Sequence, residues 1–274
     1  MNQRLPENQI NQALRHVNAH WPAYLLGYGG GAIAVLSLAL VSVRQGWWGF
    51  IPLMLASLLI LIYFFGASLW MAYKRDEQAE ANLFLAWAQL SPLDTFAHID
   101  LGQRQLALHL VRYLTTGKLT VIDVFNPQLT PGRALSRTRE QARPWPQAEP
   151  RLICLEGSVD LLPLPDRSVP VVTMAYTLPE FWQRGDQEQL LREIYRILKP
   201  GGRLIVLEQM RHPQNVWFLG PLVWRWPAAA YWHELLTTTG FTIRKEQPIH
   251  ARLAQLFRAD KPVQYQSRQL DLGF

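Results

Sequence analysis

Residues 98–127 read HIDLGQRQLALHLVRYLTTGKLTVIDVFNP, and this stretch decides the fold. Two short apolar runs end in an aspartate each, Asp100 and Asp123, and enclose a segment whose apolar residues recur at helical spacing. The pattern predicts a strand, a helix and a second strand, the repeating unit of parallel sheets. Because parallel strands end at the same edge of a sheet, we expect the two aspartates to end adjacent strands.

The residues that follow continue this alternation. Apolar runs at 151–157 (RLICLEG), 169–176 (VPVVTMAY) and 203–209 (RLIVLEQ) predict three more strands. Helices are expected over 130–142, a basic segment, and over 187–198, which ends at the Lys-Pro-Gly-Gly of 199–202. The region from 229 to 262 predicts another helix and two closing strands that form an antiparallel hairpin. The fold class is therefore α/β, a mostly parallel sheet covered by helices on both faces.

The first quarter of the chain is much more apolar than the rest. Residues 21–75 predict two helices, at about 21–43 and 47–73, each longer than the roughly 20 residues that cross a ~30 Å hydrocarbon layer. We expect a transmembrane hairpin, since a cleavable signal peptide is not followed at once by a second span. Aromatic residues occupy the positions of an interfacial belt, namely Trp21, Trp47, Trp48, Trp70 and Tyr73.

The flanking charges orient this hairpin. Basic residues lie outside it at Arg4, Arg15, Lys74 and Arg75, against Arg44 alone in the turn, which predicts that both ends are cytoplasmic. The small residues of GYGGG (27–31) are expected to let the helices approach closely. The alternative is a helical hairpin buried in a soluble core, although core helices seldom stay apolar on all sides for this length.

The segments around the hairpin complete the predicted domain organisation. Residues 1–20 are an N-terminal cytoplasmic segment, and 76–95 contain a linker helix that either lies on the bilayer surface or continues the second span. The soluble domain spans 96–262, and 263–274 form a C-terminal tail. The expected localisation is an inner (plasma) membrane with the domain in the cytoplasm.

Composition limits the function classes. The net charge is +6 and the pI about 9.6, with Lys and Arg scattered, which favours an anionic lipid surface over nucleic acid. Cys154 is the only cysteine, so the chain has no internal disulfide and no zinc cluster built on cysteines. Neither a metal site nor a phosphate loop is indicated by the spacing of His, Asp and Glu or of glycine.

Two stretches resemble a known family. EGSVDLLPLPDRSVPVVTMAYTL (156–178) and LLREIYRILKPGGRLIVLEQ (190–209) resemble the class I S-adenosylmethionine-dependent methyltransferases, especially the ubiquinone/menaquinone C-methyltransferase type. The resemblance covers roughly residues 96–260 and implies a Rossmann-like sheet with S-adenosylmethionine as cofactor. The N-terminal hairpin is not part of the usual layout of that family.

The cofactor loop departs from the family pattern. The resemblance aligns Asp100, Gly102, Gln103 and Arg104 with an acidic residue and a loop that carries two or three glycines, where this chain has one. A side chain forced to positive φ costs ~1–2 kcal/mol, and Gln103 and Arg104 extend toward space that the cofactor uses. Either the loop amides and Arg104 still hold the cofactor carboxylate, or the site has decayed and the sheet remains as a scaffold.

The resemblance implies further cofactor contacts. Asp123 corresponds to the acid that accepts hydrogen bonds from the ribose hydroxyls, with Asn126 just beyond it. Ser158 and Val159 stand where the family has an adenine-contacting carboxylate, and Met174 ends the fourth strand at the crevice where open α/β sheets bind ligands. For each of these side chains an ordinary structural role is the alternative.

The remaining candidates concern the acceptor. Tyr176 and Glu180 are expected to contact it, and Glu208 and His212 are the candidates for proton transfer. Residues 215–232 are rich in aromatic residues, and with Trp217 and Trp224 they predict a lid over the pocket, a segment in the headgroup layer, or a cap packed on the sheet.

Together these features predict a membrane-anchored S-adenosylmethionine-dependent methyltransferase for a lipophilic acceptor such as a quinone, isoprenoid or lipid. The alternative is an inactive pseudo-methyltransferase that serves as a membrane-tethered scaffold or assembly factor. Modification of nucleic acid is disfavoured, and the sequence does not specify the oligomeric state.

Overall fold

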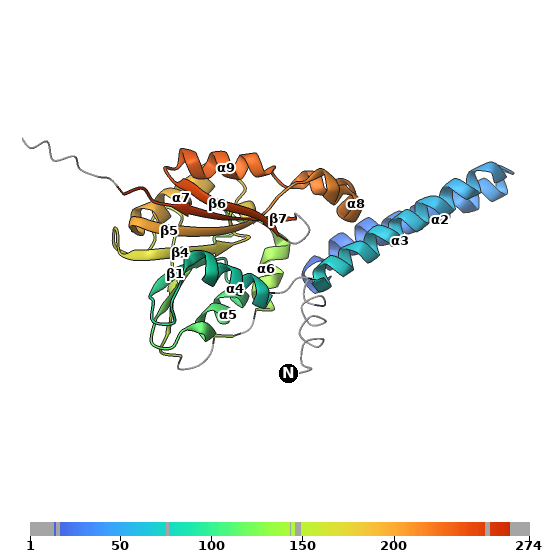
Figure 1. Ribbon diagram of the computed structural model, residues 1–274. Coiled ribbons are helices and arrows are strands. Elements are labelled where there is room, and N and C mark those ends of the chain that lie inside the picture. The colour runs from blue at the N-terminus through green and yellow to red at the C-terminus, as the bar shows by residue number, and fades with distance from the viewer. Residues whose placement is uncertain are drawn as a thin grey trace, which may run out of the picture.

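The computed structural model describes residue 14 and residues 17–74, 77–142, 144–145, 149–249 and 253–263. These residues form two parts, a long helical hairpin and an α/β domain, with the hairpin projecting from one side of the domain (Figure 1).

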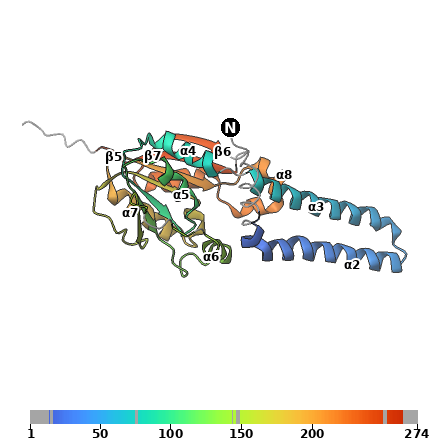
Figure 2. The same cartoon turned by 90° about the horizontal axis from the view of Figure 1, so that it is seen from below.

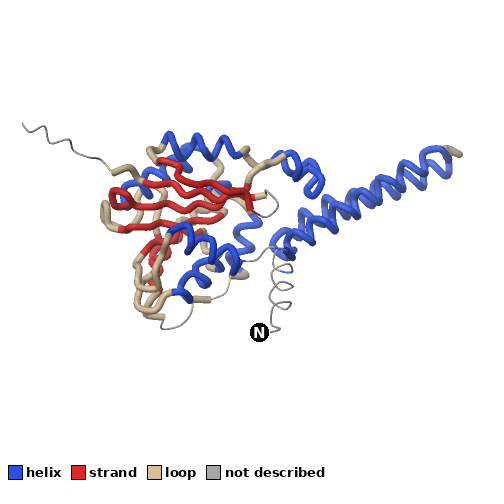
Figure 3. Tube along the Cα trace, viewed as in Figure 1, coloured by secondary structure: helices blue, strands red, loops and turns tan. Residues whose placement is uncertain are grey.

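The α/β domain is built on a seven-stranded sheet, drawn in red in Figure 3, with the order β3-β2-β1-β4-β5-β7-β6. The first five strands in the chain pair with one another in parallel, and β7 is antiparallel to both β5 and β6. This confirms the mostly parallel sheet with an antiparallel closing hairpin. The strands are β1 (Phe96–Asp100), β2 (Leu119–Asp123), β3 (Leu152–Glu156), β4 (Val169–Ala175), β5 (Leu198–Gln209), β6 (Thr242–Ile249) and β7 (Ala254–Asp260).

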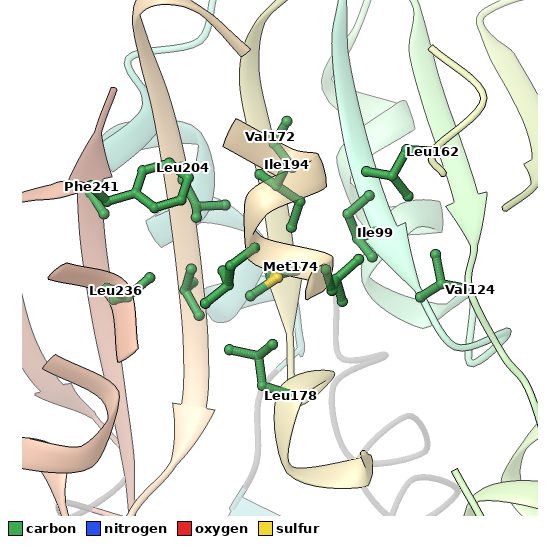
Figure 4. Close-up of a cluster of buried hydrophobic side chains, with 14 of the residues drawn as sticks. Ile99, Val124, Leu162, Val172, Met174, Leu178, Ile194, Leu204, Leu236 and Phe241 are labelled. Carbon is green, nitrogen blue, oxygen red and sulfur yellow. The ribbon is translucent and has the colours of Figure 1, made fainter. Parts of the chain in front are cut away.

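Helices cover both faces of the sheet, because its central strands are apolar on both sides. One face packs against α4 (Glu77–Ala88) and α5 (Gln105–Tyr113). The opposite face packs against α6 (Arg133–Glu140), α7 (Arg184–Ile197) and α9 (Ala229–Thr238). Figure 4 shows the core on this second face, where Ile99, Met174 and Ile194 meet.

The connection between α7 and β5 differs from the expected one. We predicted a helix to residue 198 and a strand from 203, but β5 begins at Leu198, directly after the helix, and Leu198 pairs with Val169. Gly201 adopts a positive φ of +74°, which the glycine pair permits within the strand. The Lys-Pro-Gly-Gly segment therefore ends the helix, as predicted, while remaining part of the sheet.

Helix α4 corrects our expectation for the linker. Phe84, Ala81 and Ala88 are fully buried, and they pack in the same cluster as Leu110 of α5 and Leu207 of β5. The apolar face of the helix is thus covered by the domain itself. This face is therefore not available to a bilayer surface.

The hairpin consists of two helices that are long and apolar enough to cross a membrane, Val17–Arg44 and Trp48–Tyr73. In the most apolar stretch of 18 residues in each helix, only 6% and 0% of the residues are buried. The hairpin is therefore not folded into the core of the domain. Within the described residues it comprises a π-helical turn η1 (Leu25–Gly29), α2 (Gly30–Arg44), a 3₁₀ turn η2 (Trp48–Phe50) and α3 (Ile51–Lys74).

Close packing holds the two helices of the hairpin side by side (Figure 2). A methyl group added to Gly31 would lie 3.3 Å from a methyl of Leu61, so the small residue permits the close approach expected of the GYGGG segment. Nearer the domain, the hydroxyl of Tyr24 lies 2.6 Å from Oγ of Ser68.

Short helical turns fill two connections of the domain. η3 (Leu178–Glu180) follows β4. Between β5 and α9 the chain forms η4 (Pro213–Asn215), α8 (Val216–Leu219) and η5 (Gly220–Arg225), which lie beside the domain end of α3 (Figure 1).

Candidate active site

The two aspartates from which the sequence analysis began end adjacent strands. Asp100 of β1 is paired directly with Asp123 of β2, so both carboxylates stand on the carboxyl edge of the sheet. The Asp100 side chain is 7% exposed and accepts hydrogen bonds from the amides of Leu101, Gln103 and Arg104, at 2.8, 3.2 and 2.7 Å. Burial raises the pKa of Asp100, the Arg104 amide opposes the rise, and the nearby Asp123 adds to it.

The loop that Asp100 holds is strained at one position. Gly102 has φ +75°, a conformation that glycine adopts readily. Arg104, which caps α5, has φ +66°, so a side chain does occupy the left-handed region at a cost of about 1 kcal/mol. Its guanidinium lies 5.3 Å from the ring centre of Trp145. Arg104 therefore packs on an aromatic ring, and its expected contact with a cofactor carboxylate stays a prediction.

Arg139 of α6 occupies the edge between the two strands, which sequence reasoning missed. Its Nη1 donates to both carboxylate oxygens of Asp123 at 2.8 Å and to the carbonyl of Leu101 at 2.5 Å. The guanidinium also lies 4.0 Å from the ring centre of Phe125. A methyl group added to Gly102 would collide with Nη1, so the arginine fills the space next to the glycine. No local sequence signal marks Arg139 among the arginines of its helix.

The other predicted cofactor contacts have local structural roles. Asn126 accepts a hydrogen bond from the Gln128 amide at 2.9 Å, which shapes the loop between β2 and α6. Ser158 is exposed, and its hydroxyl accepts from the Asp160 amide at 3.3 Å. Val159 is 3% exposed within the core. Gln103 donates its amide to Asp100, as described above. Whether these residues also meet a cofactor stays a prediction.

Glu208 lies fully buried at the end of β5. Its Oε1 accepts hydrogen bonds from the amides of Thr177 and Leu178, at 3.2 and 3.1 Å. Its Oε2 has no hydrogen-bond partner among the described residues. Burial raises the pKa of Glu208 to about 8, the two amides oppose the rise, and Glu180 adds to it. A carboxyl group of this kind exchanges a proton near neutral pH, which suits a general acid or base.

Two predicted residues, Met174 and Tyr176, lie at or just after the end of β4. The Met174 side chain is fully buried among core residues (Figure 4), and its expected contact with a cofactor stays a prediction. A strand residue points to one face of the sheet, and this face is covered by α7. Tyr176, at φ +53°, donates its hydroxyl to Glu80 of α4 at 3.0 Å, a contact that packing explains.

Three further candidates lie around this edge. Glu180 reaches toward the start of α6, since a methyl group on Gly132 would lie 3.0 Å from its Oε2. The carbonyl of His212 accepts from the Asn215 amide at 2.9 Å at the start of the aromatic segment. Trp217 and Trp224 are 72% and 61% exposed. The structure brings Glu180 close enough to Glu208 to affect its pKa, but it does not bring the tryptophans into a closed pocket among the described residues.

Among the described residues, no group of three or more His, Cys, Asp or Glu could hold a metal ion. The exposed thiol of Cys154 has a pKa that is raised mainly by partial burial. The chemically distinctive features of the edge are therefore the Asp100–Asp123 pair, the arginine between the strands and the buried Glu208.

Comparison with known proteins agrees with this layout. Residues 99–206 match the family model described as Methyltransferase domain. Over 137 residues, 49% of this chain, it is 26% identical to the ubiquinone/menaquinone biosynthesis C-methyltransferase UbiE of a Ruegeria species, of which it covers 50%. Over 118 residues, 43% of this chain, it is 35% identical to the demethylmenaquinone methyltransferase of Thermus thermophilus, of which it covers 48%. The chain thus spans about half the length of these curated relatives.

Solved structures share the fold at low identity. The [4+2]-cyclase SpnF is 20% identical with a TM-score of 0.52, over 69% of this chain and 85% of that one. A SAM dependent methyltransferase from Aquifex aeolicus is 16% identical with a TM-score of 0.50, over 66% and 88%. Residues 99–206 thus match a methyltransferase domain, and the strand order of the sheet agrees with the fold of the methyltransferase structures that it resembles.

Proposed function

We propose that the protein is a membrane-anchored S-adenosylmethionine-dependent methyltransferase whose acceptor is a lipophilic small molecule. The observation that carries the enzymatic part is the pairing of Asp100 with Asp123 at the carboxyl edge of the sheet, beside a loop whose amides are already ordered. A carboxylate at the end of β2 can accept hydrogen bonds from the two ribose hydroxyls of the cofactor, and the amides at the start of α5 can bind the cofactor's carboxylate.

The hydrogen-bonding groups present at the edge suit the cofactor, but the Arg139 side chain occupies part of the space that the cofactor needs. The guanidinium holds Asp123 and fills the space next to Gly102, so binding requires this flexible side chain to leave. The pair is about one quarter exposed on each side, and ion pairs of that kind contribute little stability, of order 1 kcal/mol. Its release is therefore a small barrier to binding.

When bound, S-adenosylmethionine supplies a sulfonium methyl group for in-line transfer to a nucleophile. The protein's share of such a reaction is to position the two partners and exclude water. Glu208 is the proposed proton acceptor, because its buried carboxyl group titrates near neutral pH and stands where β5 meets the aromatic segment. His212 and Glu180 remain secondary candidates on the same edge.

The membrane part of the proposal rests on the hairpin. Its two helices are long enough to span a bilayer, only 6% and 0% of the residues in their most apolar stretches are buried, and exposed tryptophans stand near both ends. A tether at the bilayer favours an acceptor that is dissolved in it, such as a quinone, isoprenoid or lipid. The orientation with the domain in the cytoplasm follows from the flanking charges and is part of this proposal.

A scaffold without catalysis is the second candidate, and Arg139 favours it, since the ribose cannot bind Asp123 while the arginine stays there. The structural similarity to a cyclase also shows that proteins with this fold need not be methyltransferases. Calorimetric titration of S-adenosylmethionine and its demethylated product into the protein in nanodiscs separates the candidates. Micromolar binding that Asp123→Ala abolishes supports the enzyme, whereas no heat at millimolar ligand, in the wild type and in Arg139→Ala alike, supports the scaffold.

The acceptor class has its own test. Radiolabelled methyl transfer is measured with a long-tailed quinol in nanodiscs and with a tail-less analogue in solution. Activity confined to the soluble analogue, and unchanged by deletion of residues 1–75, contradicts a lipophilic acceptor.

A further inference from the structure

The segment between β5 and α9 is clamped at its base and lies against the hairpin. At the base, the amide of Arg211 donates to the carbonyl of Pro227 at 2.7 Å, and Arg211 pairs with Ala228 in an isolated bridge. Away from the base, Gly220 packs on the ring of Phe64, where an added methyl group would lie 3.4 Å from the ring. Both views show α8 beside α3 (Figures 1 and 2).

The position of Phe64 along α3 sets the depth of this contact. Trp48 and Trp70 are 65% and 57% exposed and lie 22 residues apart, about 33 Å along a helix. That separation matches the ~30 Å hydrocarbon core, so the two tryptophans mark its boundaries. Phe64 precedes Trp70 by six residues, which places its neighbour Gly220 about 9 Å inside the boundary on the domain side.

The side chains of the segment suit that depth. Asn215 and Val223 are fully buried, which anchors the segment to the protein. Trp217 and Trp224, by contrast, are 72% and 61% exposed although they are large and apolar. Amphipathic segments at bilayer surfaces bury their apolar side to a depth of about 5–10 Å and use tryptophan there. The turns of α8 and η5 also satisfy much of the backbone internally, as a non-aqueous environment requires.

We propose that residues 213–225 are embedded in the domain-side leaflet beside α3, with Trp217 and Trp224 in contact with lipid. This inference rests on the proposed membrane attachment and extends it, because it turns one flank of the catalytic domain toward the bilayer interior. The embedded segment begins five residues after Glu208, at the end of β5. The carboxyl edge of the sheet therefore opens toward the bilayer, and an acceptor with a hydrophobic tail reaches it laterally without crossing water.

Depth-dependent fluorescence quenching tests the proposal on the full chain. Cys154→Ser removes the only cysteine, and single cysteines then replace Trp217, Trp224, Leu93 or Leu59. Each carries an environment-sensitive fluorophore, and the protein is placed in nanodiscs whose lipids bear nitroxides near the headgroup or deep in the acyl chain. Leu59, 66% exposed on α3, is the positive control, and Leu93, 66% exposed before β1 at the opposite edge of the sheet, is the negative one.

We expect the labels at positions 217 and 224 to be quenched several-fold more than the label at 93. Labels at 217 and 224 that match position 93 overturn the proposal, provided that position 59 is quenched. An unquenched label at 59 overturns the membrane attachment itself. Since cofactor is not needed, the result is independent of the titration that tests the enzyme.

A second measurement covers the case in which a cysteine variant does not fold. Brominated lipids quench the native tryptophans, and the quenched fraction is compared between the wild type and the conservative Trp217→Phe variant. The quenched fraction falls in the variant if Trp217 contacts lipid, and it rises if the residue lies in water.

Discussion

Arg139 contacts Asp123 and fills the space next to Gly102 at the carboxyl edge of the sheet. If Asp123 holds the cofactor ribose, as proposed, the arginine competes with the ribose for this carboxylate, and Arg139→Ala should tighten binding of the demethylated cofactor. We expect about a fivefold gain, because a partly exposed ion pair contributes about 1 kcal/mol. Isothermal titration in nanodiscs measures the change.

Arg137 provides the matched control for this measurement. It lies on the same helix but donates to the carbonyl of Ala19 at 2.6 Å, at the base of the hairpin. Arg137→Ala should leave cofactor affinity unchanged. If Arg139→Ala weakens binding instead, the arginine holds the cofactor rather than excluding it, and the competition for Asp123 is wrong.

Glu208 should make stability depend on pH near neutrality. Its pKa in the folded protein is about 8, above its ordinary value, so its contribution is complete below about pH 4 and is lost as the pH rises through 8. The slope approaches ~1.4 kcal/mol per pH unit for one proton. Glu208→Gln keeps an oxygen for the amides of Thr177 and Leu178 and should remove the slope.

Thermal unfolding of both proteins between pH 6.5 and 9 checks this expectation. The difference in Tm should shift in favour of the variant as the pH rises to 8 and then level off. His98, whose pKa burial lowers to about 4, affects both proteins equally and matters below this range. A constant difference in Tm means that Glu208 is ionised throughout.

Residues at strand ends could be predicted from the sequence, and residues that meet through tertiary packing could not. Asp100 and Asp123 were found because each ends an apolar strand, and parallel strands share an edge. The burial of Met174 could not be predicted, because an unbroken apolar strand does not reveal which face each side chain takes until the covering helices are known. Arg139 depends on the rotation of α6 relative to β1, which no local pattern encodes.

At the scale of elements, α4 shows why a helical pattern alone leaves its environment open. An amphipathic helix suits a bilayer surface and a protein core equally well, and the buried Phe84 and Ala88 settle the question for the core. The strands were predicted well for the opposite reason. A short apolar run between turn signals is typical of a buried strand and is too short for most helices.

Truncation on either side of α4 should separate its role from that of the hairpin. A chain that begins at residue 77 keeps the helix and should unfold cooperatively in solution, while one that begins at 92 should not. Loss of Phe84 alone is expected to cost about 3–5 kcal/mol, the range for large buried aromatic side chains. Circular dichroism melts of the two truncated chains and of Phe84→Ala make the comparison. Equal melts of both truncated chains contradict a structural role for α4.

At the scale of the whole molecule, the 213–225 segment lies between the hairpin and the α/β domain, with α8 beside α3 (Figure 2). Arg137 connects the base of the hairpin to α6, and Arg139 on the same helix contacts Asp123. Anchor and site are therefore joined by direct contacts rather than by a long linker. If the hairpin spans a bilayer, as proposed, these contacts should hold the domain in a fixed pose at its surface.

That pose predicts how the hairpin affects catalysis. Removal of residues 1–76 should leave cofactor affinity unchanged, because the domain keeps α4 and both strand-end aspartates. With an acceptor dissolved in nanodiscs, the rate at a fixed protein concentration should fall by about 100-fold, since the tether raises the effective concentration of the acceptor. With a tail-less soluble acceptor the rate should not change. Parallel methyl-transfer assays with the two acceptors measure the ratio, and an equal fall for both shows that the hairpin supports the fold of the site rather than delivery of the acceptor.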